Sequence, residues 1–153
     1  MQKIYTVIAA GGLGKRLKNF RDSNTTKMLL KINNESMISK QLNQLISWNL
    51  KDFIIVTNPT YDNLIREDIE KNFPNINIEY VIQNKQLGVA HALLQAENLV
   101  PKNAKILYIL GDNFFQFNPL SNLDTLSSNA LIFLKNVDNP QDFGVVELVD
   151  DKV

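Results

Sequence analysis

The fold of this chain depends on Thr6-Val-Ile-Ala-Ala-Gly-Gly-Leu-Gly-Lys-Arg-Leu17, where an apolar run breaks into three glycines within four residues. An apolar run that is stopped by glycine predicts a buried strand entering a tight loop. Because glycine has no Cβ, its backbone N–H can approach a ligand closely. A concave row of N–H groups favours anions, and Lys15 and Arg16 add positive charge to the same loop. The stretch therefore predicts a phosphate-binding loop.

Two familiar kinds of glycine loop match this stretch poorly. A P-loop places glycine, four residues, then Gly-Lys-Ser/Thr, but aligning Gly14-Lys15 puts Ala9 at the first glycine and Arg16 at the Ser/Thr. The sequence therefore excludes a P-loop. The dinucleotide fingerprint Gly-x-Gly-x-x-Gly fits Gly12 and Gly14, but Leu17 takes the place of the third glycine. The dinucleotide fingerprint is therefore incomplete.

A third pattern fits better and continues along nearly the whole chain. Its segments are Gly11-Gly12-Leu-Gly14-Lys-Arg16-Leu, Lys27-Met-Leu-Leu-Lys-Ile32, Met37-Ile38, Gln83 with Gln86-Leu-Gly88-Val-Ala90, Leu110-Gly-Asp112-Asn-Phe and Asp142-Phe-Gly144-Val-Val-Glu147. In this order they resemble the nucleotidyltransferases that make nucleotide sugars, and most of all the glucose-1-phosphate thymidylyltransferase and uridylyltransferase group. The chain departs from that family at Thr26 and Lys31, where the family usually has proline.

The resemblance implies a reaction and a set of roles. A phosphate oxygen of a sugar 1-phosphate would attack the α-phosphorus of a nucleoside triphosphate, and pyrophosphate would leave. dTTP or UTP with glucose 1-phosphate are the substrates that the resemblance favours. The implied catalytic residues are Arg16 at the leaving phosphates, Lys27 at the α-phosphate and Asp112 as the ligand of Mg²⁺; the implied nucleotide-binding residues are Ala10, Gly11, Gly12, Gly14, Lys15, Arg16, Gln83 and Gly88; Gly144 would contact the sugar.

Each of these residues also has an ordinary interpretation. Lys15, Arg16 and Lys27 could be solvated loop cations, and an aspartate after a strand commonly caps a turn. Gln83 and Gly88 could be ordinary loop residues, and a glycine in a strand can mark only a bulge. Two other functions stay open: transfer to phosphocholine or another phosphorylated alcohol, and a catalytically idle nucleotide-binding or regulatory domain. His91 has no partner histidine at ligand spacing, so we expect it to be structural.

The composition is that of an ordinary globular protein. Sixteen basic and sixteen acidic residues cancel, which favours neither a nucleic-acid nor a membrane partner. The absence of cysteine excludes disulfides and thiolate metal sites and agrees with a reducing cytoplasm. The glycine loop follows the start of the chain directly, and no apolar run has the length of a membrane-spanning helix. We therefore expect a cytoplasmic enzyme, and the family resemblance adds assembly into a homo-oligomer.

The spacing of apolar residues predicts alternating strands and helices. The predicted strands cover residues 4–9, 53–57, 76–82 and 106–110, and the predicted helices begin after an N-cap at Ser36 and cover residues 61–73 and 87–99. This order predicts an α/β fold: a doubly wound, Rossmann-like three-layer sandwich with a mostly parallel central sheet. Ligands of such folds bind outside the carboxyl ends of the strands. The glycine loop, Gln83 and Asp112 each follow a strand, so we expect them at one edge.

The last part of the chain is predicted to contain a turn and short helix at residues 118–126 and strands at residues 130–136 and 143–149. The family that the chain resembles is longer, and its second half supplies a Glu-Lys sugar-binding segment and a second metal-binding aspartate. We therefore expect residues 1–153 to form one nucleotidyltransferase domain that is shortened at its carboxyl end.

Overall fold

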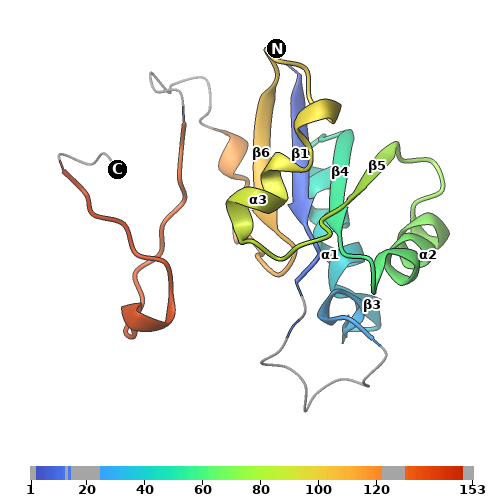
Figure 1. Ribbon diagram of the computed structural model, residues 1–153, viewed down its shortest axis with the longest axis horizontal. Helices are drawn as coiled ribbons and strands as arrows, with labels where there is room; N and C mark the ends of the chain where they lie inside the picture. The colour runs from blue at the N-terminus through green and yellow to red at the C-terminus, as the bar shows by residue number, and fades with distance from the viewer. Residues whose placement is uncertain (1–2, 13, 15–24, 122–129, 150–153) are drawn as a thin grey trace. The chain divides into compact units, whose positions relative to one another are not determined.

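The computed structural model describes residues 3–12, 14, 25–121 and 130–149. The chain divides into two compact units, Met1–Leu120 and Ser121–Val153, which are described separately. Among the described residues, the strands β1 to β6 and the helices α1 to α3 all lie in the first unit (Figure 1). The prediction of a single domain over residues 1–153 stays a prediction.

The first unit is built on a four-stranded parallel sheet in the order β5-β4-β1-β6. Its strands are β1 (Ile4–Ala9), β4 (Asp52–Thr57), β5 (Ile78–Ile82) and β6 (Lys105–Leu110). Within one or two residues these are the strands that the apolar runs predict. The two central strands, β1 and β4, have apolar side chains on both faces because both faces of the sheet are covered.

Helices cover the two faces of this sheet, as Figure 1 shows. Alternate residues of the strands belong to different core clusters: Ile8, Phe53 and Ile55 pack with α1 (Met37–Ser47) and α2 (Asp62–Asn72). Val7, Ile54 and Val56 pack with Ala92 and Ala96 in the segment that contains α3 (Val89–Leu94). The predicted three-layer α/β sandwich with a parallel central sheet is therefore confirmed.

The helices begin and end for identifiable reasons. Ser36 caps α1 as predicted, because its Oγ accepts a hydrogen bond from the Ser39 N–H at 3.1 Å. The helix predicted over residues 87–99 is shorter, and α3 gives way to the 3-10 turn η3 (Glu97–Leu99). Ala96 N–H and Leu99 N–H bond to carbonyls three residues earlier, so the segment tightens from α to 3-10 geometry.

The connection between β1 and α1 carries smaller elements. The described part contains the 3-10 turn η2 (Lys27–Leu29) and a short antiparallel pair, β2 (Lys31–Ile32) with β3 (Glu35–Ser36). Asn33 and Asn34 make the turn between these strands with positive φ angles of 54° and 67°. Asparagine tolerates this left-handed region better than most residues.

The second unit corrects part of the prediction. The strands expected at residues 130–136 and 143–149 are not formed: within residues 130–149 the structure has the 3-10 turn η5 (Pro140–Asp142) and an isolated bridge at Val149. The apolar side chains of these segments are exposed, with Phe143 at 59% and Val145 at 71%. Alternating apolar residues favour an extended chain, but a strand also needs a partner for its backbone groups. The short helix predicted at residues 118–126 lies partly outside the described residues.

Candidate functional site

The loops that follow the four parallel strands lie at one edge of the sheet, because the strands all run in the same direction (Figure 1). Gly11 and Gly12 follow β1, Asn58 follows β4, Gln83 follows β5 and Asp112 follows β6. The sequence predicted this edge as the ligand-binding edge for three of the four loops.

The residues of the glycine loop meet different requirements. Ala10 is fully buried and its N–H bonds to the Val56 carbonyl at 2.8 Å, so it extends the sheet. A Cβ on Gly11 would lie 2.9 Å from the Thr57 carbonyl oxygen, closer than real Cβ atoms come. Gly12 is exposed and has room for a side chain beside Lys27. Gly14 has a φ of +57°, a left-handed conformation that favours glycine.

Lys27 and Asp112 meet at this edge, although 85 residues separate them. Lys27 Nζ lies 2.5 Å from Asp112 Oδ2, and the two side chains are 19% and 40% exposed. Lys27 begins η2, which Thr26 caps: the buried Thr26 Oγ1 accepts a hydrogen bond from the Met28 N–H at 3.4 Å. Thr26 therefore supplies a capped turn at a position where the resembled family usually has proline.

Gly111 allows the ion pair to form. Its N–H bonds to the Ala9 carbonyl at 3.0 Å, and a Cβ on Gly111 would lie 2.5 Å from Met28 Sδ. Met28 is fully buried and follows Lys27 directly. Because Gly111 has no side chain, the Met28 turn packs against the end of β6, and Lys27 is brought to Asp112.

Gln41 is a residue of this site that the sequence interpretation missed. It is fully buried in α1, and its Nε2 donates to the carbonyls of Leu110 and Asn113 at 2.9 and 2.8 Å. These carbonyls lie on either side of Asp112, so Gln41 holds the turn that carries the carboxylate. A signal was present: Gln41 shares the helical spacing of Ile38, Leu42 and Leu45, which is a polar residue at a core position.

Gln83 and Gly88 lie together, and their predicted contact with the nucleotide base stays a prediction. Gln83 is buried, and its Nε2 lies 3.2 Å from the Gly88 carbonyl oxygen and 2.8 Å from His91 Nδ1. The two nitrogens of the His91 ring thus face two amides, Nδ1 that of Gln83 and Nε2 that of Gln95 at 3.3 Å. Gly88 has a φ of +102° at the start of α3. His91 thus contacts Gln83, and its expected structural role stays a prediction.

Three of the predicted site residues are not among the described residues that meet at this edge of the sheet. Lys15 and Arg16 lie outside the described residues. Gly144 belongs to the second unit, where it is exposed and a Cβ on it would meet nothing within 4 Å. The predicted sugar contact of Gly144 stays a prediction.

The described residues contain no group of three or more histidine, aspartate or glutamate side chains that could hold a metal. Asp112 offers one partly exposed carboxylate at the carboxyl end of β6. Magnesium is commonly held by one or two carboxylates, with substrate phosphates and water as its other ligands. A single carboxylate beside a loop that is predicted to bind phosphate therefore fits magnesium that arrives with a nucleotide.

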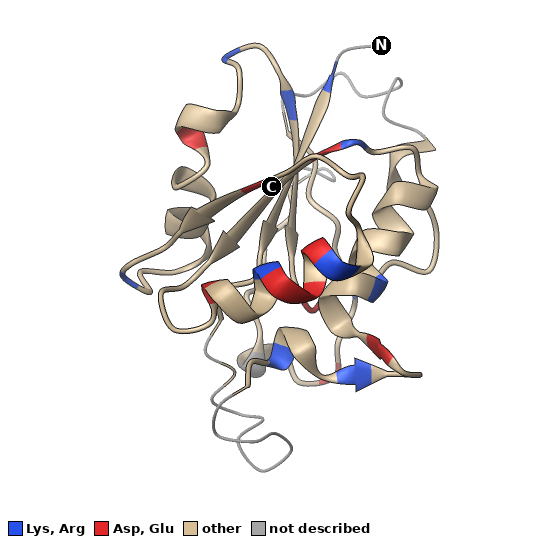
Figure 2. Cartoon of the chain, turned by 90° about the vertical axis from the view of Figure 1, so that its right-hand side faces the viewer, with Lys and Arg blue, Asp and Glu red and all other residues tan. Residues whose placement is uncertain are grey.

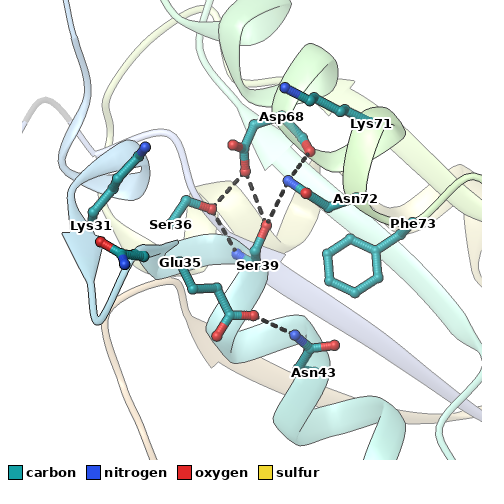
Figure 3. Close-up of a pocket in the computed structure, with 10 residues that line it drawn as sticks. Lys31, Glu35, Ser36, Ser39, Asn43, Asp68, Lys71, Asn72 and Phe73 are labelled. Carbon is teal, nitrogen blue, oxygen red and sulfur yellow. Dashed lines mark hydrogen bonds between the residues drawn. The ribbon is translucent and has the colours of Figure 1, made fainter.

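A polar pocket of about 410 Å³ lies elsewhere, lined by β3, the start of α1 and the end of α2 (Figure 3). It contains none of the predicted site residues. The hydroxyls of Ser36 and Ser39 both donate to Asp68 Oδ2, at 2.6 and 3.0 Å, and Asn72 Nδ2 donates to the Asp68 carbonyl at 2.7 Å. The two serine hydrogen bonds join the start of α1 to α2 in the lining of this pocket.

Charge is mixed on the surface around α2. Figure 2 shows acidic and basic residues interspersed along this helix, in agreement with the balanced composition. No helix within the described residues is long and apolar enough to cross a membrane.

The parallel sheet, with a glycine loop, a lysine–aspartate pair and a glutamine at its carboxyl edge, has the architecture of the doubly wound α/β proteins. Residues 5–153 match the family described as Nucleotidyl transferase, and the chain belongs to that family.

Three relatives illustrate the match. The chain is 29% identical over 166 residues to a protein of Acanthamoeba polyphaga mimivirus named Probable UDP-N-acetylglucosamine pyrophosphorylase, covering 98% of this chain and 63% of that protein. It is 27% identical over 147 residues to the glucose-1-phosphate thymidylyltransferase of Streptomyces griseus, covering 94% and 41%. A crystal structure from Bacillus anthracis, described as a glucose-1-phosphate thymidylyltransferase in complex with a sucrose, superposes with a TM-score of 0.85 at 27% identity over 98% of this chain and 62% of that one. The chain thus spans less than two thirds of the length of these relatives.

Proposed function

We propose that this chain carries the nucleotide-binding part of a sugar-1-phosphate nucleotidyltransferase. The enzyme would transfer a nucleoside monophosphate from dTTP or UTP to glucose 1-phosphate and release pyrophosphate in the cytoplasm. The observation that carries the proposal is the Lys27–Asp112 pair, which lies beside Gly12 at the carboxyl edge of the parallel sheet. One relative is named a thymidylyltransferase and another a UDP-sugar pyrophosphorylase, and these names support the choice of dTTP or UTP.

The reaction needs charge and position more than covalent chemistry from the protein. An oxygen of the sugar phosphate forms a bond to the α-phosphorus, and the bond from the α-phosphorus to the bridging oxygen of pyrophosphate breaks. In the proposal Lys27 provides a point charge at the α-phosphate, where negative charge is concentrated in the transition state. Arg16 and Lys15 would hold the leaving phosphates, since guanidinium binds two phosphate oxygens at once.

Other residues would bind the remaining parts of the substrates. The loop from Ala10 to Gly14 would receive the nucleotide, and Gln83 with Gly88 would contact the base. Gly144 would contact the sugar. Asp112 would hold Mg²⁺ together with phosphate oxygens, and the ion would neutralise charge on the triphosphate.

Pyrophosphate release tests this proposal. The purified chain would be incubated with MgCl₂, glucose 1-phosphate and each of dTTP, UTP, ATP, CTP and GTP, and then with phosphocholine in place of the sugar phosphate. Release that requires glucose 1-phosphate and is greatest with dTTP or UTP supports the proposal. Release only with phosphocholine would assign the chain to the other acceptor, and release with purine nucleotides alone would contradict the choice of base.

A further inference from the structure

Asn58 lies directly after β4, between the glycine loop and the loop that contains Gln83. Its side chain is buried, with 2% of the residue exposed. A buried polar side chain at the ligand-binding edge of a sheet needs partners for every donor and acceptor that it loses to water. The partners of Asn58 show what it holds in place.

The two ends of the Asn58 amide have different partners. Nδ2 donates to the Gly11 carbonyl at 2.8 Å, while Oδ1 accepts from the N–H groups of Thr60 and Tyr61 at 2.9 and 3.1 Å. A carbonyl on one side and two N–H groups on the other fix the orientation of the amide. Aspartate could accept both N–H bonds but could not donate to Gly11, and serine would be too short to reach it.

The bond to Gly11 sets the direction of the next N–H. The Gly11–Gly12 peptide is trans, since the described chain has no cis peptide, so its C=O and N–H point in opposite directions. With the Gly11 carbonyl held toward the buried Asn58, the Gly12 N–H points away from Asn58. Gly12 is exposed, and the position of a Cβ on it lies 3.9 Å from Lys27 Nζ. The Gly12 N–H therefore lies on the exposed side of the loop, near Lys27, the catalytic lysine of the proposed function.

The residue before Asn58 joins the base-binding loop to the same point. The Thr57 carbonyl accepts the Gln83 N–H at 2.9 Å, and it is also the atom against which Gly11 packs. The end of β4 thus contacts both the phosphate loop and the base loop, as well as the start of α2.

We propose that Asn58 is a positioning residue for triphosphate binding: it holds the Gly11 carbonyl so that the Gly12 N–H faces the phosphates of the nucleotide. This inference rests on the proposed function, because it assigns the glycine loop to the triphosphate. Asn58 acts through Gly11 and does not itself touch the substrate.

Asn58→Ser is the test variant, because a serine hydroxyl can still accept from the N–H groups of the turn but is too short to donate to the Gly11 carbonyl. The dissociation constants for UTP and dTTP would be measured by calorimetry without sugar phosphate, so that no turnover occurs. We expect an increase of about tenfold, the size of one lost hydrogen bond to a charged group. Asn58→Asp keeps the oxygen that accepts from Thr60 and Tyr61 but opposes the Gly11 carbonyl with a carboxylate, so it should weaken binding further.

Ser36→Ala is the matched control. It removes the cap of α1, which Ser36 makes to the Ser39 N–H, and should lower the melting temperature without changing either dissociation constant. A second readout follows the loop without nucleotide: the Gly12 amide resonance of a nitrogen-labelled sample should shift in Asn58→Ser and stay in place in Ser36→Ala.

The outcomes separate this inference from the function on which it rests. Wild-type affinity in Asn58→Ser, or an unmoved Gly12 resonance, would overturn the positioning role while leaving nucleotide binding intact. An equal loss of affinity in Ser36→Ala would also overturn it, since the effect would then follow stability alone. A wild-type chain that binds neither triphosphate would overturn the proposed function and this inference together.

Discussion

Lys27 and Asp112 form a partly exposed ion pair, so its contribution to stability should be small, about 0–1 kcal/mol. Its chemical role should be much larger. We expect Lys27→Met to reduce pyrophosphate release by about 100-fold or more, the usual loss when one group that stabilises transition-state charge is removed. The melting temperature should change by no more than about 4 °C, as for a loss near 1 kcal/mol. Both quantities would be measured on the same preparations.

Lys3 provides the control for this substitution. Its Nζ lies 2.8 Å from Asp52 Oδ1, so it also pairs with an aspartate, but it does so before β1, at the opposite edge of the sheet. Lys3→Met should cost a similarly small amount of stability and leave pyrophosphate release unchanged. A Lys27→Met enzyme as active as Lys3→Met would contradict the role given to Lys27.

Tyr80 gives a prediction that depends on pH. Burial, with the charge of Glu70 as a smaller cause, raises the pKa of Tyr80 from 10.0 to about 12. The folded protein therefore keeps this phenol neutral at pH values where the unfolded chain ionises. Ionisation of Tyr80 therefore leaves the stability unchanged below about pH 10 and lowers it as the pH rises toward 12. Urea unfolding should show the free energy of unfolding falling across this range.

The hydroxyl of Tyr80 is buried and has no hydrogen-bond partner among the described residues. Tyr80→Phe should therefore raise the free energy of unfolding at neutral pH by up to about 1 kcal/mol and make its fall above pH 10 less steep. Tyr108 is the matched control, because its hydroxyl donates to the Val89 carbonyl at 2.7 Å. Tyr108→Phe should instead lose about 0.5–1.5 kcal/mol at neutral pH. Equal effects of the two substitutions would contradict this account.

The candidate residues that belong to motifs can be selected from the sequence alone. Residues whose proposed role depends on a hydrogen bond to a distant part of the chain cannot. Lys27, Asp112 and Gln83 could be predicted because they stand at fixed places around strand ends. Asn58 could not, because an asparagine before a proline looks like any turn. Its role depends on which carbonyl its amide reaches, and that atom lies 47 residues away.

At the scale of one element, the loop after β1 predicts opposite results for neighbouring glycines. A methyl group on Gly11 would lie 2.9 Å from the Thr57 carbonyl, a backbone atom that cannot easily move. Gly11→Ala should therefore destabilise the protein by about 1–3 kcal/mol through overpacking. A methyl group on Gly12 would lie 3.7 Å from Lys27 Cε, an ordinary contact, so Gly12→Ala should change stability little. Thermal unfolding of the two variants in parallel tests the difference.

The strands of the sheet were predictable for a physical reason that the second unit lacks. Residues 53–57 form one apolar run, and within β4 the side chains of Phe53 to Thr57 are all buried because helices cover both faces. Residues 143–149 also contain five apolar side chains, yet these side chains are exposed. The hydropathy of a segment indicates its tendency to be buried. Whether the segment forms a strand also depends on a partner strand, which the local sequence does not specify.

For the molecule as a whole, nucleotide binding and turnover are separable. A ligand that binds only the folded state raises its stability by RT ln(1 + [L]/Kd), about 2.7 kcal/mol at one hundred times Kd. For a chain of 153 residues this corresponds to a rise of about 5–10 °C in melting temperature. We expect dTTP or UTP with magnesium to produce such a rise, and we expect Gln83→Ala to reduce it, because this change removes the side chain that is proposed to contact the base.

This measurement also distinguishes the enzyme from an idle nucleotide-binding domain. The chain spans about three fifths of the mimivirus and Bacillus anthracis relatives, so a nucleotide-dependent rise without pyrophosphate release would place binding within these residues and turnover in a longer protein. A rise accompanied by release would show that residues 1–153 suffice for catalysis. Equal shifts with every nucleotide in wild type and Gln83→Ala would contradict base recognition at the end of β5. The glycine loop would then be the part of the site that binds, because phosphates are common to all of them.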